Sequence, residues 1–483
     1  MELARRLGIR YLWVDTLCIV QDDQQERSRQ ISLMGNIYNN STLTIAAAAG
    51  KNPHAGLYGI SPRAGRPIEK YRIKDPDESM FLTLSLCLPS LCQEVRKSKW
   101  YTRGWTYQEQ CLSQRCIYFT TDEIFFQCPE VQWREGYDYG EQLVPFQDLR
   151  IRTGPPWWSK RLRKDPDPTP YHYLWDVTMR QQAESYQRAV REYTRRSLTS
   201  PHDVLHAFEG IFNRFNRQEN ASDLDIRRTQ GIPVHLLLQA ILWFPSNSCQ
   251  RRLCNDKQIT GVVEQFSTWS WASWDGPIEF IFAESLWLSR SISHAPRRNV
   301  PLHICIPWWQ FGDSMRKVWT NSSWKAVGEN HHKSPGHFPD DFLHSQQYLS
   351  DHIGVDIVQL VNHSITLHQS MPRCGQLRFV APYFGSGKFV LSGAVDKSIR
   401  VVTLCGVYCG EFQFDGQTIK PVDELVLVLC TNTLNKIPKK VGVFLGLATH
   451  NGLSVRAGIG FVYFAQDAKV TKPPIEYKLF TIQ

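Results

Sequence analysis

The first part of the chain shows apolar runs of strand length that alternate with apolar stripes at helical spacing. Residues 2–7 are typical of the last turns of a helix, and Gly8 suits the left-handed position that ends one. Residues 11–14 (YLWV) predict a short buried strand with Asp15 at its carboxyl end. Ligands of open α/β sheets bind at that end of a strand, which makes Asp15 a candidate site residue.

The next two elements predict a crossover connection. Asp23 with Glu26 three residues later resembles a capping box, so we predict a helix over residues 24–39. Residues 41–50 (STLTIAAAAG) predict a second strand that ends in glycine. Strand, helix and strand in this order indicate a right-handed crossover within a parallel sheet.

The following stretch completes a partial α/β domain at residues 1–142. Residues 51–98 are rich in proline, glycine and charge, so we interpret them as an insertion with one extra strand in MFLTLSLCL. Residues 116–128 (CIYFTTDEIFFQC) predict a further strand, a turn and another apolar run. Prolines and tryptophans at residues 143–175 indicate a linker, because proline interrupts both helices and central strands.

Two apolar stripes predict a helical region at residues 176–245. The stripes consist of Tyr186, Ala189, Val190 and Tyr193, and of Leu205, Phe208, Phe212 and Phe215. Residues 235–244 (HLLLQAILWF) predict a third, largely buried helix. Residues 246–345 combine a tryptophan-rich strand, FSTWSWASWDG, with long loops that include Trp308 to Leu343. The period of two places Trp269 and Trp271 on one face of that strand, where we interpret them as core residues.

Strand patterns dominate residues 346–483, where apolar segments recur between turn signals and predict an antiparallel β-rich domain. HNGL at residues 450–453 predicts a hairpin, since asparagine and glycine tolerate the positive φ of a tight turn. The predicted fold class is therefore mixed. It joins a parallel α/β module, a helical middle region and a β-rich C-terminal domain.

Composition narrows the classes of function. The chain has 483 residues, 42% hydrophobic and 21% charged, which is typical of a folded soluble protein. Its net charge of +9 comes from scattered basic pairs, whereas a nucleic-acid surface is usually clustered, so we predict no nucleic-acid partner. No apolar run approaches the ~18 residues of a membrane span, and no secretory signal opens the chain, so we expect a cytoplasmic protein. The 13 cysteines match no zinc spacing and the adjacent His331 and His332 would point apart in a strand, so no metal site and no cofactor are predicted.

Residues 100–119 (WYTRGWTYQEQCLSQRCIYF) mix aromatic side chains with charged groups that rarely enter a core unpaired. Trp105 and Glu109 are four residues apart, so a helix would place the carboxylate beside an aromatic face. Two interpretations remain open. Glu109 belongs to a ligand site, or it forms a buried salt-bridge network with Arg103 and Arg115 that ties the helix to the sheet.

Three motifs in the same order resemble the heterokaryon incompatibility (HET) domain of filamentous fungi. They are YLWVDTLCIVQDD, the following helix with MGNIY, and RGWTYQEQCLSQR. The segments YTRRSLTSPHDVLHAFEGI and FSTWSWASWDG also resemble stretches that commonly follow this domain. The family pattern opens upstream with a strand resembling LSYxWG, and Met1 falls inside the helix after it. We therefore expect a HET domain truncated at its N-terminus, and Val20 departs from the asparagine that is common at its position.

The resemblance implies a protein of fungal nonself recognition and programmed cell death signalling, which acts through a HET-domain interaction module with protein partners or by self-association. HET domains are also similar in layout to TIR domains, some of which hydrolyse NAD⁺ with a glutamate in a WxxxE-like segment. Residues 105–109 have that pattern, so an NAD⁺ glycohydrolase with Glu109 as catalytic residue is the alternative function. In that case Trp13 and Trp105 would stack on a base, Asp15 would accept a ribose hydroxyl and Arg103 would contact a phosphate. NAD would be a substrate, and an inactive truncated family member is the third alternative.

Overall fold

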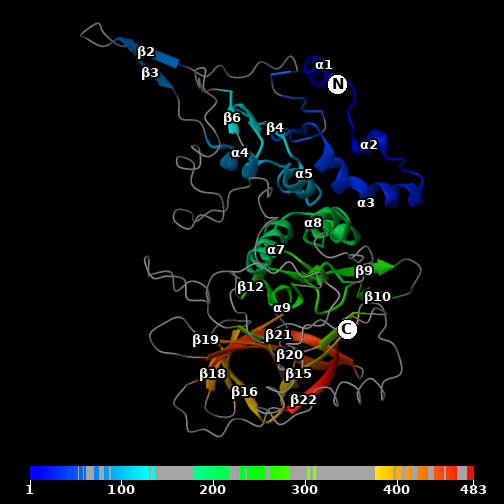
Figure 1. The fold of residues 1–483 in the computed structure, drawn as a ribbon, viewed down its shortest axis with the longest axis vertical. Coiled ribbons are helices and arrows are strands. Elements are labelled where there is room, and N and C mark those ends of the chain that lie inside the picture. The colour runs from blue at the N-terminus through cyan, green and yellow to red at the C-terminus, as the bar shows by residue number, and fades with distance from the viewer. Residues whose placement is uncertain are drawn as a thin grey trace, which may run out of the picture. The chain divides into compact units, whose positions relative to one another are not determined.

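The chain folds into two compact units, which are shown in the computed structural model (Figure 1). Unit 1 comprises residues 1–176 and 196–211, and unit 2 comprises residues 177–195 and 212–483. The structure describes residues 1–52, 54–57, 59–60, 70–74, 81–85, 89–129, 132–135, 179–216, 226, 229–233, 236–246, 248–256, 261–264, 266–281, 302–304, 308–311, 376–394, 399–404, 408–415, 421–432, 440–450, 453–464 and 476–482. The predicted linker at residues 143–175 and the pair His331 and His332 lie outside this part of the chain.

Unit 1 begins with three helices, α1 (Glu2–Arg6), α2 (Asp15–Cys18) and α3 (Gln24–Asn40). The helix signals in the sequence are confirmed. Gly8 follows α1 with φ of +68°, in the left-handed region. The Asp23 side chain accepts hydrogen bonds from the backbone N–H groups of Gln25 and Glu26 at the start of α3. Such caps depend only on neighbours in the sequence, so the sequence predicts them well.

The predicted strand at residues 11–14 is wrong. No described strand pairs with this segment, and the side chains of Tyr11 and Leu12 are 83% and 40% exposed. Asp15 opens the helix α2 and does not end a strand. The apolar pattern is consistent with a strand, but a strand also needs a neighbour that satisfies its backbone N–H and C=O groups. The described part of unit 1 offers residues 11–14 no such neighbour.

A four-stranded sheet forms the centre of unit 1. Its strands, in spatial order, are β1 (Thr44–Ala46), β4 (Cys116–Phe119), β5 (Ile124–Gln127) and β6 (Gln132–Arg134). β1 and β4 are parallel, and the other neighbours are antiparallel. A parallel pair is thus present, but it joins β1 to β4 and not the strands predicted at residues 11–14 and 41–50. β1 is an edge strand among the described strands.

Four elements connect β1 to β4: β2 (Lys70–Lys74), β3 (Phe81–Ser85), α4 (Leu91–Lys97) and α5 (Thr106–Leu112). β2 and β3 form a hairpin that projects from the rest of the unit, and β3 confirms the strand expected in MFLTLSLCL (Figure 1). Ser90 and Gln93 form a capping box at the start of α4. Seven buried side chains make the core against this sheet, namely Ala46, Leu91, Val95, Trp100, Cys116, Tyr118 and Phe125.

Three helices follow, α7 (Met179–Thr194), α8 (His206–Asn216) and α9 (Leu237–Ala240). Both predicted stripes are confirmed as buried, with Tyr186, Val190, Phe208 and Phe212 fully inaccessible to solvent. The helix predicted over residues 235–244 is wrong in its second half. α9 ends at Ala240, and Trp243–Pro245 form the strand β7, which pairs with β12 (Ile278–Phe280). A short continuous apolar run does not distinguish a buried helix from a buried strand, so the distant partner β12 decides.

The tryptophan-rich segment was predicted correctly as core but incorrectly as a strand. Trp269 and Trp271 are fully buried, and residues 271–273 form a 3₁₀ helix. The Ser270 hydroxyl accepts a hydrogen bond of 3.0 Å from the Ala272 N–H, which starts this turn locally. Short strands surround the segment: β8 (Gln250–Arg251), β9 (Leu253–Asp256), β10 (Gly261–Glu264) and β11 (Trp274–Asp275).

The C-terminal part is a ten-stranded sheet, as the strand pattern predicts. Its strands are β13 (Leu302–Ile304), β14 (Trp308–Phe311), β15 (Leu377–Gly385), β16 (Phe389–Ala394), β17 (Ile399–Leu404), β18 (Tyr408–Phe414), β19 (Glu424–Asn432), β20 (Lys440–His450), β21 (Leu453–Phe464) and β22 (Glu476–Ile482). Pairing is antiparallel except for one parallel bridge between β21 and β22. The prediction of a loop from Trp308 is wrong at its start, because Trp308–Phe311 form β14 and pair with β15. The pairing of His450 with Leu453 confirms the predicted hairpin.

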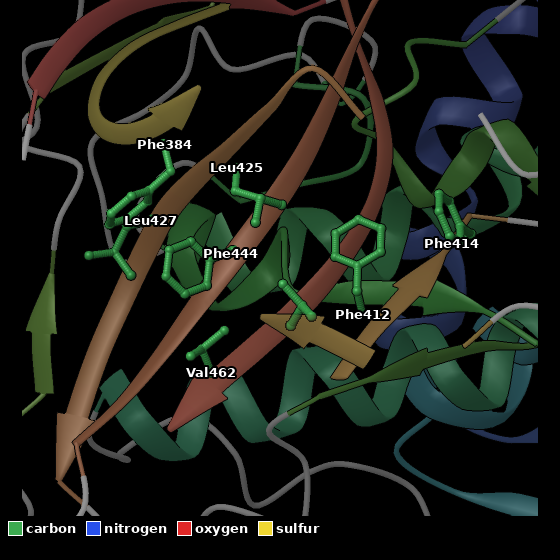
Figure 2. Packing of buried hydrophobic residues seen from close by; sticks show 8 residues of the cluster. Phe384, Phe412, Phe414, Leu425, Leu427, Phe444 and Val462 are labelled. Carbon is green, nitrogen blue, oxygen red and sulfur yellow. The ribbon is translucent and has the colours of Figure 1, made fainter. Parts of the chain in front are cut away.

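Pairings within this sheet close on themselves, because β19, β20, β21, β22 and β15 each pair with the next and β15 pairs back with β19. Aromatic and branched side chains converge on a core between the strands (Figure 2). They include Phe384, Phe412, Phe414, Leu425, Leu427, Phe444 and Val462. The C-terminal sheet therefore has its own core. None of the helices in the described part of the chain combines the length and apolar character that a bilayer crossing requires.

Candidate functional site around Glu109

Helix α5 positions Glu109 inside unit 1. The helix is short, and its N-cap residue Trp105 contributes no side-chain cap. The Thr106 hydroxyl donates to the backbone carbonyls of Trp100, at 2.6 Å, and Arg103, at 2.8 Å, and so fixes the loop that precedes the helix. At the other end, the Ser113 hydroxyl donates to the Glu109 carbonyl at 2.6 Å. Side-chain hydrogen bonds thus fix the loop before this helix and satisfy a carbonyl at its end, and the helix is too short to be stable alone.

The Glu109 carboxylate is half-buried and hydrogen-bonded by an indole. Trp100 Nε1 donates to Glu109 Oε2 at 3.0 Å, and the Trp100 ring packs edge-on against Tyr118 with centroids 5.9 Å apart. Burial raises the pKa of Glu109 above its ordinary value, while the Trp100 hydrogen bond and the charge of Arg103 oppose that rise. The site therefore holds a carboxylate whose charged form is disfavoured by desolvation and only partly restored by its neighbours.

Tyr38 of α3 brings a second element to the carboxylate. Burial raises the pKa of Tyr38, and the negative charges of Glu109 and Asp15, together with a hydrogen bond to Glu109, add to this rise. The Trp13 ring packs edge-on against Tyr38, with centroids 5.8 Å apart. Trp13, Asp15, Tyr38 and Glu109 thus belong to one electrostatic neighbourhood, although residues 11–14 form no strand.

Four of the five predicted site residues fall in this neighbourhood. Arg103 is exposed and acts on Glu109 through its charge, and Asp15 is exposed at the start of α2. Trp105 is half-buried, but the indole that binds Glu109 is that of Trp100. The four-residue spacing of Trp105 and Glu109 did not indicate Trp100 as the residue that donates to the carboxylate. The chain folds back at residues 100–106, and Trp100 reaches the carboxylate nine positions away.

The alternative salt-bridge network is not observed. Arg103 and Arg115 are both exposed, and neither forms an ion pair with Glu109 within the described residues. Sequence reasoning missed Tyr38 and Trp100. Tyr38 carried a usable signal, because a hydroxyl-bearing ring on the apolar stripe of a helix commonly finds a polar partner when buried.

Close helix packing holds α5 against its neighbours in unit 1. Gly35 of α3 and Gly210 of α8 approach so closely that a Cβ on Gly35 would lie 2.7 Å from the Gly210 Cα. Gln108 of α5 fits into the same junction, where its Nε2 donates to the His206 carbonyl at 3.0 Å. A Cβ on Gly210 would collide with Gln108 Oε1. Because Gly35 and Gly210 have no side chains, α3 and α8 come close together, and this junction positions the helix that carries Glu109.

No metal centre is apparent in the described residues, which contain no cluster of three or more histidine, cysteine, aspartate or glutamate side chains arranged to bind an ion. Six cysteines, Cys18, Cys92, Cys111, Cys116, Cys128 and Cys249, are free thiols, and burial raises the pKa of Cys116 to about 12. A thiol with a raised pKa is a poor nucleophile.

The comparison with known families identifies the class of the N-terminal segment. Residues 1–109 match the model of the family described as heterokaryon incompatibility protein (HET). This match confirms the resemblance inferred from the three motifs, and it spans Trp13, Tyr38, Trp100 and Glu109. No curated protein and no solved structure matches the chain.

Proposed function

We propose that the chain is a cytoplasmic protein of fungal nonself recognition, which promotes heterokaryon incompatibility and programmed cell death through self-association of its HET segment. The observation that carries this proposal is the family match of residues 1–109, which supports heterokaryon incompatibility. We also propose that the HET segment has a layout similar to that of TIR domains, which are signalling modules. The surface of unit 1 supports the mechanism.

Exposed apolar side chains concentrate at the start of the chain. Eight large apolar residues are exposed in the described structure, and all except Val390 lie within residues 1–33. They are Met1, Leu7, Tyr11, Leu12, Leu17, Val20, Leu33 and Val390. A concentration of this kind on one segment is typical of a protein interaction surface. Single exposed apolar residues, such as Val390, need no such explanation.

A second copy of the chain is the occupant that fits this surface. Residues 11–14 have strand-forming side chains but pair with no described strand, and β1 (Thr44–Ala46) presents an edge that no described strand covers. One copy thus supplies an apolar strand-like segment, and another supplies an open edge, so that both are satisfied by addition of a strand. Contact of this kind would couple association of HET segments to signalling.

Replacement of both Tyr11 and Leu17 by aspartate is expected to weaken self-association roughly 100-fold or more, since burial of each side chain contributes ~1.5–3 kcal/mol. Sedimentation velocity over a range of protein concentrations measures the dissociation constant. Val390→Asp is the matched control, because Val390 is also exposed, at 60%, but lies in unit 2. A wild-type chain that stays monomeric at all concentrations would contradict the proposal, and so would equal weakening by the control.

The Glu109 neighbourhood favours a second candidate function, hydrolysis of NAD⁺ to nicotinamide and ADP-ribose. In this reaction water adds to the ribose carbon as the bond to nicotinamide breaks, and one proton is released. A carboxylate beside the ribose stabilises the oxocarbenium-like transition state or orients the water. Tyr38 and Trp100 fix the carboxylate, Trp13 offers an aromatic ring, and the exposed Asp15 and Arg103 offer groups for a ribose hydroxyl and a phosphate. Trp105 retains its predicted role against a base in this candidate.

The variant Glu109→Gln distinguishes a catalytic role of the Glu109 carboxylate from a structural role. The pKa of Glu109 is raised in the folded protein, so its stabilising contribution is fully present below the unfolded pKa and is lost as the pH rises through the raised value. An uncharged glutamine that keeps the Trp100 hydrogen bond is therefore expected to leave the melting temperature at neutral pH equal or higher, with a flatter dependence on pH.

The same variant is expected to abolish nicotinamide release from NAD⁺, which chromatography of the reaction mixture measures. Glu94→Gln is the control, because Glu94 is another half-buried glutamate of unit 1 whose pKa is raised by burial, and it lies on α4. Its turnover should match that of the wild type. Absence of nicotinamide release by concentrated wild-type protein would eliminate the enzyme function and leave the interaction module.

A further inference from the structure

Three consecutive residues outside the family match, Arg196–Leu198, contact the segment that carries Glu109. We call them the strap. Ser197 N donates to the Thr102 carbonyl at 2.6 Å, and Gly104 N donates to the Ser197 carbonyl at 2.8 Å. The strap thus adds a short parallel bridge beside Arg103, in the loop before α5. Leu198 packs directly on Gly104, where a Cβ would lie 2.9 Å from Leu198 Cγ. A side chain at residue 104 would therefore force the Leu198 side chain to move.

Arg196 anchors the strap to α5 itself. Its guanidinium lies between two aromatic rings, 4.2 Å from the Tyr101 centroid and 4.7 Å from the Tyr107 centroid. Nη1 donates to Thr106 Oγ1 at 3.1 Å, and Nη2 donates to Gln110 Oε1 at 2.6 Å. Arg196 is only 7% exposed. A buried guanidinium with partners on successive turns holds α5 in both position and rotation.

The strap begins where helix α7 of unit 2 ends. Thr194 is the last residue of α7. Arg195 ends the first segment of unit 2, and Arg196 begins the second segment of unit 1. Within unit 2 the end of α7 is fastened to β12. Glu279 accepts from Arg191 at 2.6 Å and from Arg195 at 2.8 Å, and the Ile278 N–H donates to Thr194 Oγ1 at 3.0 Å.

We propose that the strap relays changes at the end of α7 in unit 2 to α5 and Glu109 in unit 1. The physical reason is that the connection between α7 and the strap is too short to absorb a displacement. One residue separates the last helical position from the first strap position, and consecutive Cα atoms are ~3.8 Å apart. A displacement of the end of α7 by more than a few ångströms must therefore break the Glu279 contacts or pull the strap from residues 101–110. The relay is a property of the covalent chain, and it holds whatever the HET segment binds.

The relay predicts that a change confined to unit 2 loosens the strap. Glu279→Gln in the full-length chain removes the ion pairs with Arg191 and Arg195, and roughly tenfold faster hydrogen exchange is expected at the amides of Gly104 and Ser197, as for the loss of one or two hydrogen bonds. Lys478→Met, which removes a different ion pair of unit 2, is the control and should leave both amides unchanged.

Insertion of two glycines between Arg195 and Arg196 provides the decisive comparison. The insertion supplies slack without removing a contact, so Glu279→Gln in this background should no longer change exchange at Gly104 or Ser197. Arg196→Met and Gly104→Ala mark the fully released strap, with fast exchange at the same amides in either background, and Arg196→Lys should recover part of the protection. If Glu279→Gln has the same effect with and without the insertion, or none in the native chain, the relay is disproved.

Discussion

Replacement of Arg456 by methionine is expected to destabilise unit 2 by about 3–5 kcal/mol. The side chains of Arg456 and Asp415 are 0% and 5% exposed, with Arg456 Nε and Asp415 Oδ2 2.8 Å apart. The same guanidinium donates to the carbonyls of Ile241, at 2.7 Å, and Trp243, and it lies 3.8 Å above the Trp243 ring. Methionine retains much of the volume but leaves a buried carboxylate and two buried carbonyls without their donor.

Urea unfolding of the full-length variant measures this loss. Lys478→Met is the control, because Lys478 pairs with Glu424 at 2.5 Å in the same sheet but is 49% exposed. Exposed pairs contribute only about 0–1 kcal/mol, so little change is expected there. The double change Arg456→Met with Asp415→Leu removes both charges and should be less destabilising than the single one. A double variant that is no more stable than the single variant would show that the unpaired carboxylate is not the cause.

Gly210→Ala is expected to destabilise unit 1 by about 1–3 kcal/mol, although alanine is ~1 kcal/mol more favourable than glycine inside a helix. The added Cβ would collide with Gln108 Oε1 and lie 2.7 Å from Leu112 Cδ1 and 2.9 Å from the Gly35 Cα. Two of these atoms belong to α5, so the strain acts on the helix that holds Glu109. Backbone hydrogen exchange of unit 1 peptides, measured as a function of denaturant, reports the change.

Two further variants test the explanation. Gly385→Ala is the control, because the nearest atom to its Cβ would be Tyr383 Cε2 at 3.8 Å, an ordinary contact distance. Gly35→Ala fills the same junction as Gly210→Ala from the opposite helix, so the two changes together should cost less than the sum of the single effects, since the first has already separated the helices. Additive losses, or a Gly210→Ala variant as stable as the wild type, would mean that the helices do not meet through these glycines.

Elements with local signals could be predicted from the sequence. The Asp23 cap, the glycine after α1 and the hairpin between β20 and β21 each depend on residues a few positions apart, and the structure confirms all three. The apolar stripes of α7 and α8 also identify buried faces correctly, because an amphipathic helix has few other ways to bury them. The incorrect predictions concern elements that need a distant partner. Residues 11–14 have no partner among the described strands, and β7 pairs with β12.

For the candidate site, too, local motifs were informative and contacts between distant residues could not be predicted. The motifs around Asp15 and Glu109 pointed to a HET-type segment, and the family match at residues 1–109 agrees. The helical spacing of Trp105 and Glu109 gave no indication of Trp100, whose indole reaches the carboxylate through a turn of the backbone. Arg196 could not be assigned to this region at all, since 86 residues separate it from Gln110.

By itself, the sequence of this protein indicated a HET-type N-terminal segment, the helices α1, α3, α7 and α8, and the β-rich character of residues 346–483, because these depend on short motifs and on hydrophobic periodicity. Only the tertiary structure decided that residues 11–14 pair with no described strand, that Trp100 and Tyr38 lie beside Glu109, and that Arg196–Leu198 bind the loop before α5. The physical reason is that burial and hydrogen bonding act between side chains that meet in space. Glu109 therefore acquires its raised pKa and its partners only when α3, α5 and Trp100 come together.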